Sequence, residues 1–255
     1  MALLPRGQPW PPIAPDVDFE TIKEDLVQEI VTGNATIYGL NSRPSLVFKY
    51  QGTPREYELQ KAAGDCAIQV RGRVLAQAGS NIYCYGFLMD RGLPINPLAP
   101  MTPQQRRDYV HQMVHQTELL HSKGIVHGDL KLGNMLIFGG IRFCDFADGR
   151  YVTEAEKKWA GNTTWYIESP NRHHRAEKLG CETVPPTKED DLFGLGLSIW
   201  QLYTGKTPHE DLVWDSEALK TLGLNRQTVD VKQVKDDEVR NKIIELLRIG
   251  GAHIS

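Results

Sequence analysis

Two short stretches near the middle of the chain combine residue types that can bind a divalent cation and move a proton. Residues 127–134 read His-Gly-Asp-Leu-Lys-Leu-Gly-Asn and carry Asp129, Lys131 and Asn134, and Asp145 follows a short apolar segment. Carboxylate and amide oxygens are the ligands that Mg²⁺ prefers, and a further carboxylate can accept a proton from a hydroxyl group. These side chains fit the needs of phosphoryl transfer, in which positioning and charge neutralisation do most of the work.

The segment that joins the two stretches predicts a β-hairpin. Residues 135–138 and 141–144 are mostly apolar, and the Gly-Gly pair at 139–140 is typical of a tight turn between two strands. A hairpin folds the chain back on itself, so we expect Asp145 to lie beside Asn134.

The spacing His-x-Asp-x-Lys-x-x-Asn, followed by Asp-Phe, resembles the catalytic signature of the protein kinases. The resemblance implies that Asp129 orients the substrate hydroxyl and accepts its proton, and that Lys131 neutralises charge on the γ-phosphoryl group. It further implies that Asn134 and Asp145 hold Mg²⁺. A lysine at position 131 favours serine and threonine substrates.

Alternating and apolar runs predict four strands in the first third of the chain, at residues 35–40, 45–50, 70–76 and 81–89. The resemblance implies that Lys49, at the end of the second strand, pairs with the α and β phosphates of ATP.

A helix is predicted from Thr53, where Thr-Pro-Arg-Glu has the form of a capping box, to about Ala63. By resemblance, this helix carries a glutamate that pairs with the strand lysine. Glu56 and Glu58 both qualify, and the sequence leaves the choice open.

The remaining nucleotide contacts are also implied by the resemblance. Gly33 lies where kinases have a glycine-rich loop, and Gly39 is the next glycine along the chain. Met89 would limit the depth of the adenine pocket, and backbone groups around Asp90 to Gly92 would read the adenine edge.

Helical patterns dominate the rest of the chain. A capping box at Thr102 starts an amphipathic helix that runs toward Gly124, residues 192–203 form the most hydrophobic helix, and residues 239–247 form a last amphipathic one. By resemblance, Asp191 hydrogen-bonds the backbone of the loop that carries Asp129.

Three positions depart from the kinase pattern. Gly128 replaces the usual arginine before Asp129, which implies that loop phosphorylation is not an on-switch. Ala147 replaces the glycine after Asp-Phe. Asn171 replaces the glutamate of Ala-Pro-Glu, so the ion pair that anchors this segment to the C-terminal helices is not expected.

Composition excludes several other classes of protein. A net charge of −3 gives no electrostatic reason to expect nucleic acid or an anionic membrane as a partner. The sequence has no run of about eighteen apolar residues that could span a membrane. Its four cysteines lack CxxC spacing and are typical of reduced thiols, which predicts a cytoplasmic or nuclear protein.

The sequence therefore predicts an α+β, bilobal protein kinase-like fold, with a small antiparallel-sheet N-lobe and a mainly helical C-lobe. We expect a proline-rich arm over residues 1–17, an N-lobe over 18–91 and a C-lobe over 92–255. The predicted activity is transfer of the γ-phosphoryl group of ATP, with Mg²⁺, to serine or threonine hydroxyls of a protein substrate. Two alternatives remain: a pseudokinase that acts as a binding or scaffold module, and a phosphotransferase for small molecules of the aminoglycoside or choline kinase type.

Overall fold

The structure is a computed structural model that describes residues 16–31, 35–154, 164–182 and 184–254. Most of the predicted N-terminal arm, and Gly33, lie outside these residues. The chain divides into two compact units, Met1–Leu93 and Pro94–Ser255, and each is described by itself.

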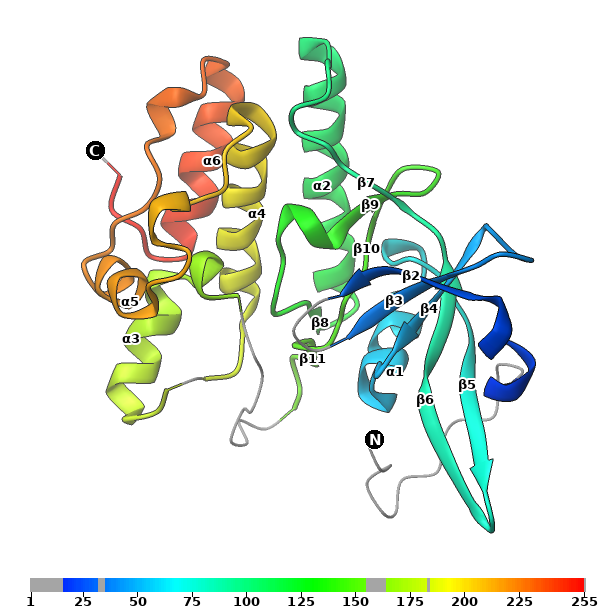
Figure 1. Ribbon diagram of the computed structural model, residues 1–255. Coiled ribbons are helices and arrows are strands. Elements are labelled where there is room, and N and C mark those ends of the chain that lie inside the picture. Colours follow the sequence, from blue (N-terminus) through cyan, green and yellow to red (C-terminus); the bar gives the residue numbers. More distant parts are fainter. Residues whose placement is uncertain (1–15, 32–34, 155–163, 183, 255) are drawn as a thin grey trace. The chain divides into compact units, whose positions relative to one another are not determined.

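A six-stranded sheet forms the first unit, with strand order β1-β5-β6-β4-β3-β2 (Figure 1). All neighbouring strands are antiparallel except β1 and β5, which are parallel. The predicted antiparallel sheet is confirmed, and its strands have these bounds: β1 Val17–Asp18, β2 Leu26–Val31, β3 Thr36–Leu40, β4 Leu46–Tyr50, β5 Val70–Ala78 and β6 Asn81–Asp90.

The spacing of Phe19, Ile22 and Leu26 suits either a helix or the approach to a first strand, and residues 18–29 form no α-helix. They form two short 3₁₀ turns, η1 (Phe19–Thr21) and η2 (Lys23–Asp25), and then enter β2. Phe19 stacks on Tyr85 with ring centroids 4.7 Å apart, and Ile22 joins a buried cluster with Phe48 of the sheet. These apolar side chains pack on the sheet from the two 3₁₀ turns and not from a helix.

The helix α1 (Pro54–Ala63) begins and ends where the sequence predicts, and the 3₁₀ turn η3 (Gly64–Cys66) follows it. Its buried residues include Tyr57, whose ring meets that of Phe87 on β6 edge-on at 5.7 Å. The aromatic pair packs the helix against the sheet.

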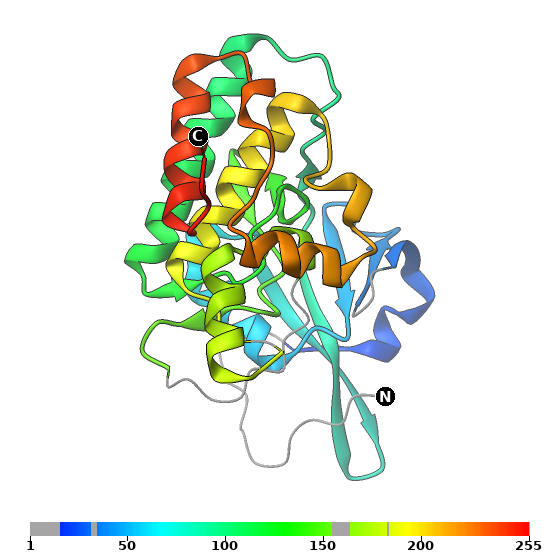
Figure 2. The same ribbon diagram turned by 90° about the vertical axis from the view of Figure 1, so that its left-hand side faces the viewer.

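The second unit is mainly helical, as predicted. Its helices are α2 Pro103–Ser122, α3 Pro170–Leu179, α4 Lys188–Thr204, α5 Ser216–Leu224 and α6 Asp237–Ile249. Helix α2 begins with a complete capping box between Thr102 and Gln105. Two views show α4 running alongside α2 and α6 (Figures 1 and 2).

Helix α4 is buried along nearly its whole length, which agrees with its hydrophobic sequence. A Cβ atom at Gly194 would lie 2.3 Å from the carbonyl oxygen of Leu130, so only glycine permits this approach. The central helix therefore packs directly against the loop that follows Asp129.

Short strands and 3₁₀ turns complete the second unit. The predicted hairpin is formed by β9 (Met135–Ile137) and β10 (Ile141–Phe143), and β8 (Ile125–Val126) pairs with β11 (Arg150–Tyr151). The remaining elements are β7 Leu93–Pro94 at the boundary of the units, and the 3₁₀ turns η4 Leu132–Asn134, η5 Trp165–Ile167, η6 Glu210–Leu212 and η7 Val231–Gln233. None of the helices in the described part of the chain has the length and hydropathy needed to cross a bilayer.

Candidate active site

The hairpin brings the two halves of the predicted site together. Strands β9 and β10 pair so that Met135 lies opposite Phe143, and the backbone N–H of Cys144 donates to the carbonyl of Asn134 at 3.0 Å. Asp145, the next residue, therefore leaves the hairpin beside Asn134. Its φ of 66° lies in the left-handed region, which aspartate tolerates better than most residues.

The Asp129 carboxylate lies at the centre of a hydrogen-bond network. Its Oδ2 accepts from Lys131 Nζ at 2.7 Å and from Asn134 Nδ2 at 3.0 Å, and its Oδ1 accepts from the backbone N–H of Thr164 at 3.4 Å. The side chain is almost completely buried. The oxygen with the weaker contact, Oδ1, is the one better able to accept a new proton.

The orientation of Asn134 fits a role in metal binding. Its Nδ2 donates to the Asp129 carbonyl at 2.8 Å as well as to the carboxylate. Both donor bonds hold the amide in one orientation, so its oxygen is the atom that can meet a cation. That oxygen and the carboxylate of neighbouring Asp145 are ligands of the type that Mg²⁺ prefers.

Lys131 links Asp129 to a later segment of the chain. Its Nζ donates to Thr164 Oγ1 at 2.5 Å in addition to Asp129. Burial disfavours the charged ammonium, but attraction to Asp129 and the hydrogen bond to it outweigh burial and raise the pKa of Lys131. Lys131 is thus a stable positive charge. Thr164, which sequence reasoning did not select as a site residue, is part of the same network.

Asp191 fixes the backbone of the loop, as the resemblance implies. Its Oδ2 accepts from the N–H of His127 and its Oδ1 from the N–H of Gly128, both at 2.8 Å, and His121 Nε2 lies 2.8 Å from Oδ2. Asp191 is only 1% exposed, so one buried carboxylate is satisfied by three donors.

His127 is a structural residue. Its Nε2 donates to the carbonyl of Cys144 at 3.0 Å, its Nδ1 accepts from the N–H of Asp129 at 3.4 Å, and its ring lies 4.6 Å from that of Phe146. The ring therefore joins the Asp129 loop to the segment that carries Asp145.

Gly128 could not be replaced by arginine in this backbone. Its φ is 83°, and a Cβ atom would lie 2.1 Å from the carbonyl oxygen of Asp148. The neighbouring departure, Ala147, does not take a left-handed conformation, whereas Asp145 does.

Asp148 is a second buried carboxylate near the network. Burial, and then repulsion from Asp129 and Asp145, raise the pKa of Asp148 to about 6, while the positive charge of Arg172 acts in the opposite direction. No local sequence pattern marks Asp148 as buried.

Hydrogen bonds, rather than an ion pair at Asn171, anchor the segment that follows. The Asn171 N–H donates to the Gly250 carbonyl at 3.0 Å, its Nδ2 to the Ile249 carbonyl at 3.2 Å, and its Oδ1 accepts from Arg226 Nη1 at 3.4 Å. The Asn171 amide and backbone N–H therefore tie the segment to the end of α6, and the charged Arg226 also donates to the amide oxygen.

In the first unit, Lys49 pairs with Glu56. The Lys49 Nζ donates to Glu56 Oε1, and both side chains are almost completely buried. Glu58 Oε1 is buried without a hydrogen-bond partner among the described residues, and burial raises the pKa of Glu58. The choice that the sequence left open between the two glutamates falls on Glu56.

Because its carboxylate bonds Lys49, Glu56 does not complete a capping box. Thr53 Oγ1 accepts from the Glu56 N–H at 3.1 Å, which satisfies one donor of the first turn. Only this half of the predicted box is present in α1.

The predicted adenine contacts lie at the end of β6. Met89 is buried, and its Sδ accepts from Gln60 Nε2 at 3.5 Å. The N–H of Asp90 donates to the carbonyl of Gln69, and its carboxylate forms a bidentate pair with Arg71 at 2.7 and 2.6 Å. The N–H of Asp90 is therefore already used within the unit, which leaves other backbone groups, such as those of Gly92, for the predicted contacts to a base edge.

The absence of a side chain at Gly39 has a local structural explanation. A Cβ atom there would lie 2.2 Å from Glu29 Oε1 and 2.7 Å from Arg91 Nη2, and these two side chains form an ion pair of 2.7 Å. The absence of a side chain at Gly39 makes room for this pair.

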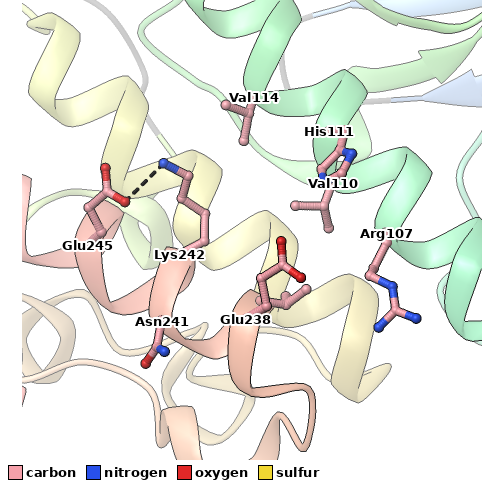
Figure 3. A pocket seen from close by; sticks show the side chains of 9 residues that line it. Arg107, Val110, His111, Val114, Glu238, Asn241, Lys242 and Glu245 are labelled. Atoms are coloured by element: carbon pink, nitrogen blue, oxygen red, sulfur yellow. Dashed lines mark hydrogen bonds and ion pairs between the residues drawn. The ribbon is translucent and has the colours of Figure 1, made fainter.

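A pocket of about 290 Å³ lies between α2 and α6 (Figure 3). Val110 and Val114 line one side of it, and Lys242 and Glu245, which form an ion pair of 2.9 Å, line the other. It contains none of the predicted site residues.

Comparison with known proteins agrees with the motif. Residues 83–248 match the model of the protein kinase domain. The chain is 27% identical over 116 residues to the serine/threonine-protein kinase mos of Patiria pectinifera, covering 44% of this chain and 32% of the relative. It is 28% identical over 131 residues to the mitogen-activated protein kinase MKC1 of Candida albicans, covering 50% and 26%.

Human serine/threonine-protein kinase 10 is 32% identical over 130 residues, which cover 49% of this chain and 12% of the relative. The matched region is thus about a third or less of the length of these three relatives. The family model covers well over half of the chain, and it includes both Asp129 and Asp145. The chain belongs to the protein kinase family.

Proposed function

We propose that this protein transfers the γ-phosphoryl group of ATP to serine or threonine hydroxyls of a protein substrate. The observation that carries the proposal is the arrangement of Lys131, Asn134 and Thr164 around the carboxylate of Asp129. A carboxylate held in this way can orient a hydroxyl and accept its proton, which is the contribution that phosphoryl transfer requires of a side chain.

The proposed roles follow from the local chemistry. Asp129 Oδ1 accepts the proton of the substrate hydroxyl. Lys131, whose charge is stabilised by Asp129, neutralises negative charge on the transferred group. Asn134 and Asp145 hold Mg²⁺ through oxygen. When bound, Mg²⁺ supplies charge neutralisation for the phosphate oxygens.

Roles in nucleotide binding are proposed for the first unit. Lys49, held by Glu56, is the cation for the α and β phosphates. Met89 and the backbone near Asp90 and Gly92 meet the adenine, and Gly33 belongs to the loop over the phosphates. We also propose that the two units correspond to the kinase lobes, with the boundary after residue 91.

Specificity for serine and threonine is supported by Lys131 and by its bond to Thr164. The identity of the matched relatives, which are serine/threonine and mitogen-activated protein kinases, points the same way.

The test is transfer of labelled γ-phosphate from Mg-ATP to the protein itself and to a generic basic protein substrate, with Asp129→Ala as the paired variant. We expect phosphoserine or phosphothreonine that disappears in Asp129→Ala, while ATP binding is retained. ATP binding without transfer by the unaltered protein would instead favour a pseudokinase or a small-molecule phosphotransferase. Absence of ATP binding would favour a scaffold module that does not use nucleotide.

A further inference from the structure

A buried arginine on α3 reaches the loop that carries Asp129. Arg172 is 2% exposed, and its Nη1 lies 3.4 Å from the carbonyl oxygen of Gly128, to which it donates. Its Nε donates to the carbonyl of Val184 at 3.2 Å and lies 3.8 Å from Glu168 Oε1. One planar guanidinium thus contacts three separate segments of the second unit.

A guanidinium in such a position requires several acceptors. Removing a charge from water costs several kcal/mol unless other groups replace the lost hydration. Here two carbonyls and the Glu168 carboxylate replace the lost hydration. The positive charge of Arg172 also lowers the pKa of the buried Asp148 carboxyl, against the larger effect of burial. The fork of an arginine can reach two carbonyls in different directions, which the single ammonium of a lysine cannot do equally well.

The contact with Gly128 completes the support of the peptide that leads into Asp129. The Gly128 N–H donates to Asp191, the Asp129 N–H donates to His127, and the carbonyl between them accepts from Arg172. With these groups held, the Asp129 backbone has one orientation, and its carboxylate is directed by Lys131.

A side chain at position 128 could not give this support itself, because its Cβ atom would collide with the carbonyl of Asp148. The cation therefore comes from another element. The start of helix α3, which carries Arg172, is held in place by two hydrogen bonds. Ser169 Oγ at the N-cap donates to Asp190, and the N–H of Asn171 donates to the carbonyl of Gly250.

We propose that Arg172 is a positioning residue, which holds the Gly128–Asp129 peptide in the orientation needed for transfer by Asp129. The proposal rests on the proposed function. It assigns the control of Asp129 to an arginine that is permanently part of the fold, so transfer needs no phosphate on the segment between Asp145 and Ser169.

The test compares Arg172→Met with Arg175→Met, both in the full chain. Arg175 lies on the same helix and loses an ion pair of 2.6 Å with Asp190 when it is replaced. Within the described part of the chain, its hydrogen bonds go to Pro185 and Asp190 and not to the Asp129 loop. We expect Arg172→Met to lower kcat on the order of 100-fold, because a small misplacement of a reacting group has an effect of this size. The KM for ATP should change less than about threefold, since Arg172 is not among the residues proposed to hold the nucleotide. Arg175→Met should keep kcat within about threefold of the unaltered protein.

Two further measurements separate positioning from a general loss of structure. In an Asp129→Ala background, Arg172→Met should cause no further loss of the residual transfer, because both changes act on the same group. Arg172→Lys should recover thermal stability more fully than it recovers kcat. Equal losses of kcat in the Arg172→Met and Arg175→Met variants, or additive losses with Asp129→Ala, would overturn the proposal.

Failure of the proposed function is recognised separately, because the unaltered protein would then transfer no more phosphate than Asp129→Ala. The proposal about Arg172 is still tested by amide hydrogen exchange. Exchange at residues 127–131 should rise in Arg172→Met and stay unchanged in Arg175→Met, and unchanged exchange in both variants would overturn it. Treatment of the active protein with a phosphatase should leave its initial rate unchanged, and a loss of activity would contradict the internal role of Arg172.

Discussion

The ammonium of Lys49 is bonded to the carboxylate of Glu56, which lies on the buried face of α1 together with Leu59 and Ala63. Glu58 lies two residues further along the helix and so points in a nearly opposite direction. Only one of the two glutamates can therefore share a face with the residues that pack on the sheet.

Replacement of these glutamates should have very different effects. Glu56→Gln removes the charged partner of a buried lysine, which typically costs on the order of 3 kcal/mol in the free energy of unfolding. It should also raise the KM for ATP about tenfold or more, because Lys49 loses its fixed position. Glu58→Gln is the matched control, and it should not lower the free energy of unfolding, because burial already disfavours the charge of Glu58. Urea unfolding and ATP titration would check both, and equal effects would contradict the assignment of Glu56.

Gly128 and Gly133 lie in the same loop and offer a second comparison. Gly128→Ala places a Cβ atom 2.1 Å from the Asp148 carbonyl in a backbone with positive φ, whereas nothing lies within 4 Å of a Cβ atom at Gly133. We expect Gly128→Ala to lower the free energy of unfolding by about 2 kcal/mol or more and to lower kcat strongly. Gly133→Ala should be close to neutral. Similar melting temperatures for the two variants would show that the backbone at Gly128 is not constrained as described.

Thr164 provides a test of the network around Lys131. Thr164→Val keeps the shape of the side chain but removes the hydroxyl that accepts from Lys131 Nζ at 2.5 Å. A hydrogen bond to a charged group contributes about 1.5–3 kcal/mol, so we expect kcat to fall about tenfold or more. Thr164→Ser retains the hydroxyl and should stay within about threefold of the unaltered protein. Steady-state kinetics would decide, and an unchanged kcat in Thr164→Val would remove Thr164 from the site.

Much of the fold could be predicted because its signals are local. The capping box at Thr102 starts α2, and the Gly-Gly turn between two apolar runs makes the β9–β10 hairpin. The hairpin in turn determines that Asp145 and Asn134 are neighbours. Residues 18–29 were ambiguous because their apolar spacing suits either a helix or the approach to a first strand, and packing of Phe19 on Tyr85 favours the approach to β2.

Sequence alone could not indicate the contacts that join segments distant in sequence. Arg172 reaches Gly128 across 44 residues, and Thr164 reaches Lys131 across 33. No local pattern distinguishes them from other polar residues. Glu56 is different, because Leu59 and Ala63 at the third and seventh positions after it indicate the buried face, and this spacing could have excluded Glu58.

We expect the stability of the fold to depend on pH through His173 on α3. Burial, and then the positive charges of Arg172 and Lys220, lower the pKa of His173 to about 4 from an ordinary value of 6.5. Glu168 Oε2 lies 3.6 Å from its Nδ1, too far for a good hydrogen bond that would favour the charged ring.

The sign of the effect follows from proton binding. Between about pH 6.5 and pH 4, the unfolded chain binds a proton at His173 that the folded protein does not bind. The free energy of unfolding should therefore fall as the pH is lowered through this range, by on the order of 2 kcal/mol from His173 alone. His173→Gln should flatten this dependence, whereas His115→Gln, at an exposed position on α2, should not.

Urea unfolding between pH 7.5 and pH 4.5 measures the slopes. Asp148, whose raised pKa of about 6 acts in the opposite direction, and His209, whose pKa burial lowers to about 4, are present in every variant. The difference between the His173→Gln slope and that of the unaltered protein therefore isolates His173. If both proteins lose stability equally on acidification, His173 is not held neutral by its surroundings, and the packing of α3 against Gly223, where a Cβ atom would lie 2.2 Å from the His173 ring, would need to be looser than described.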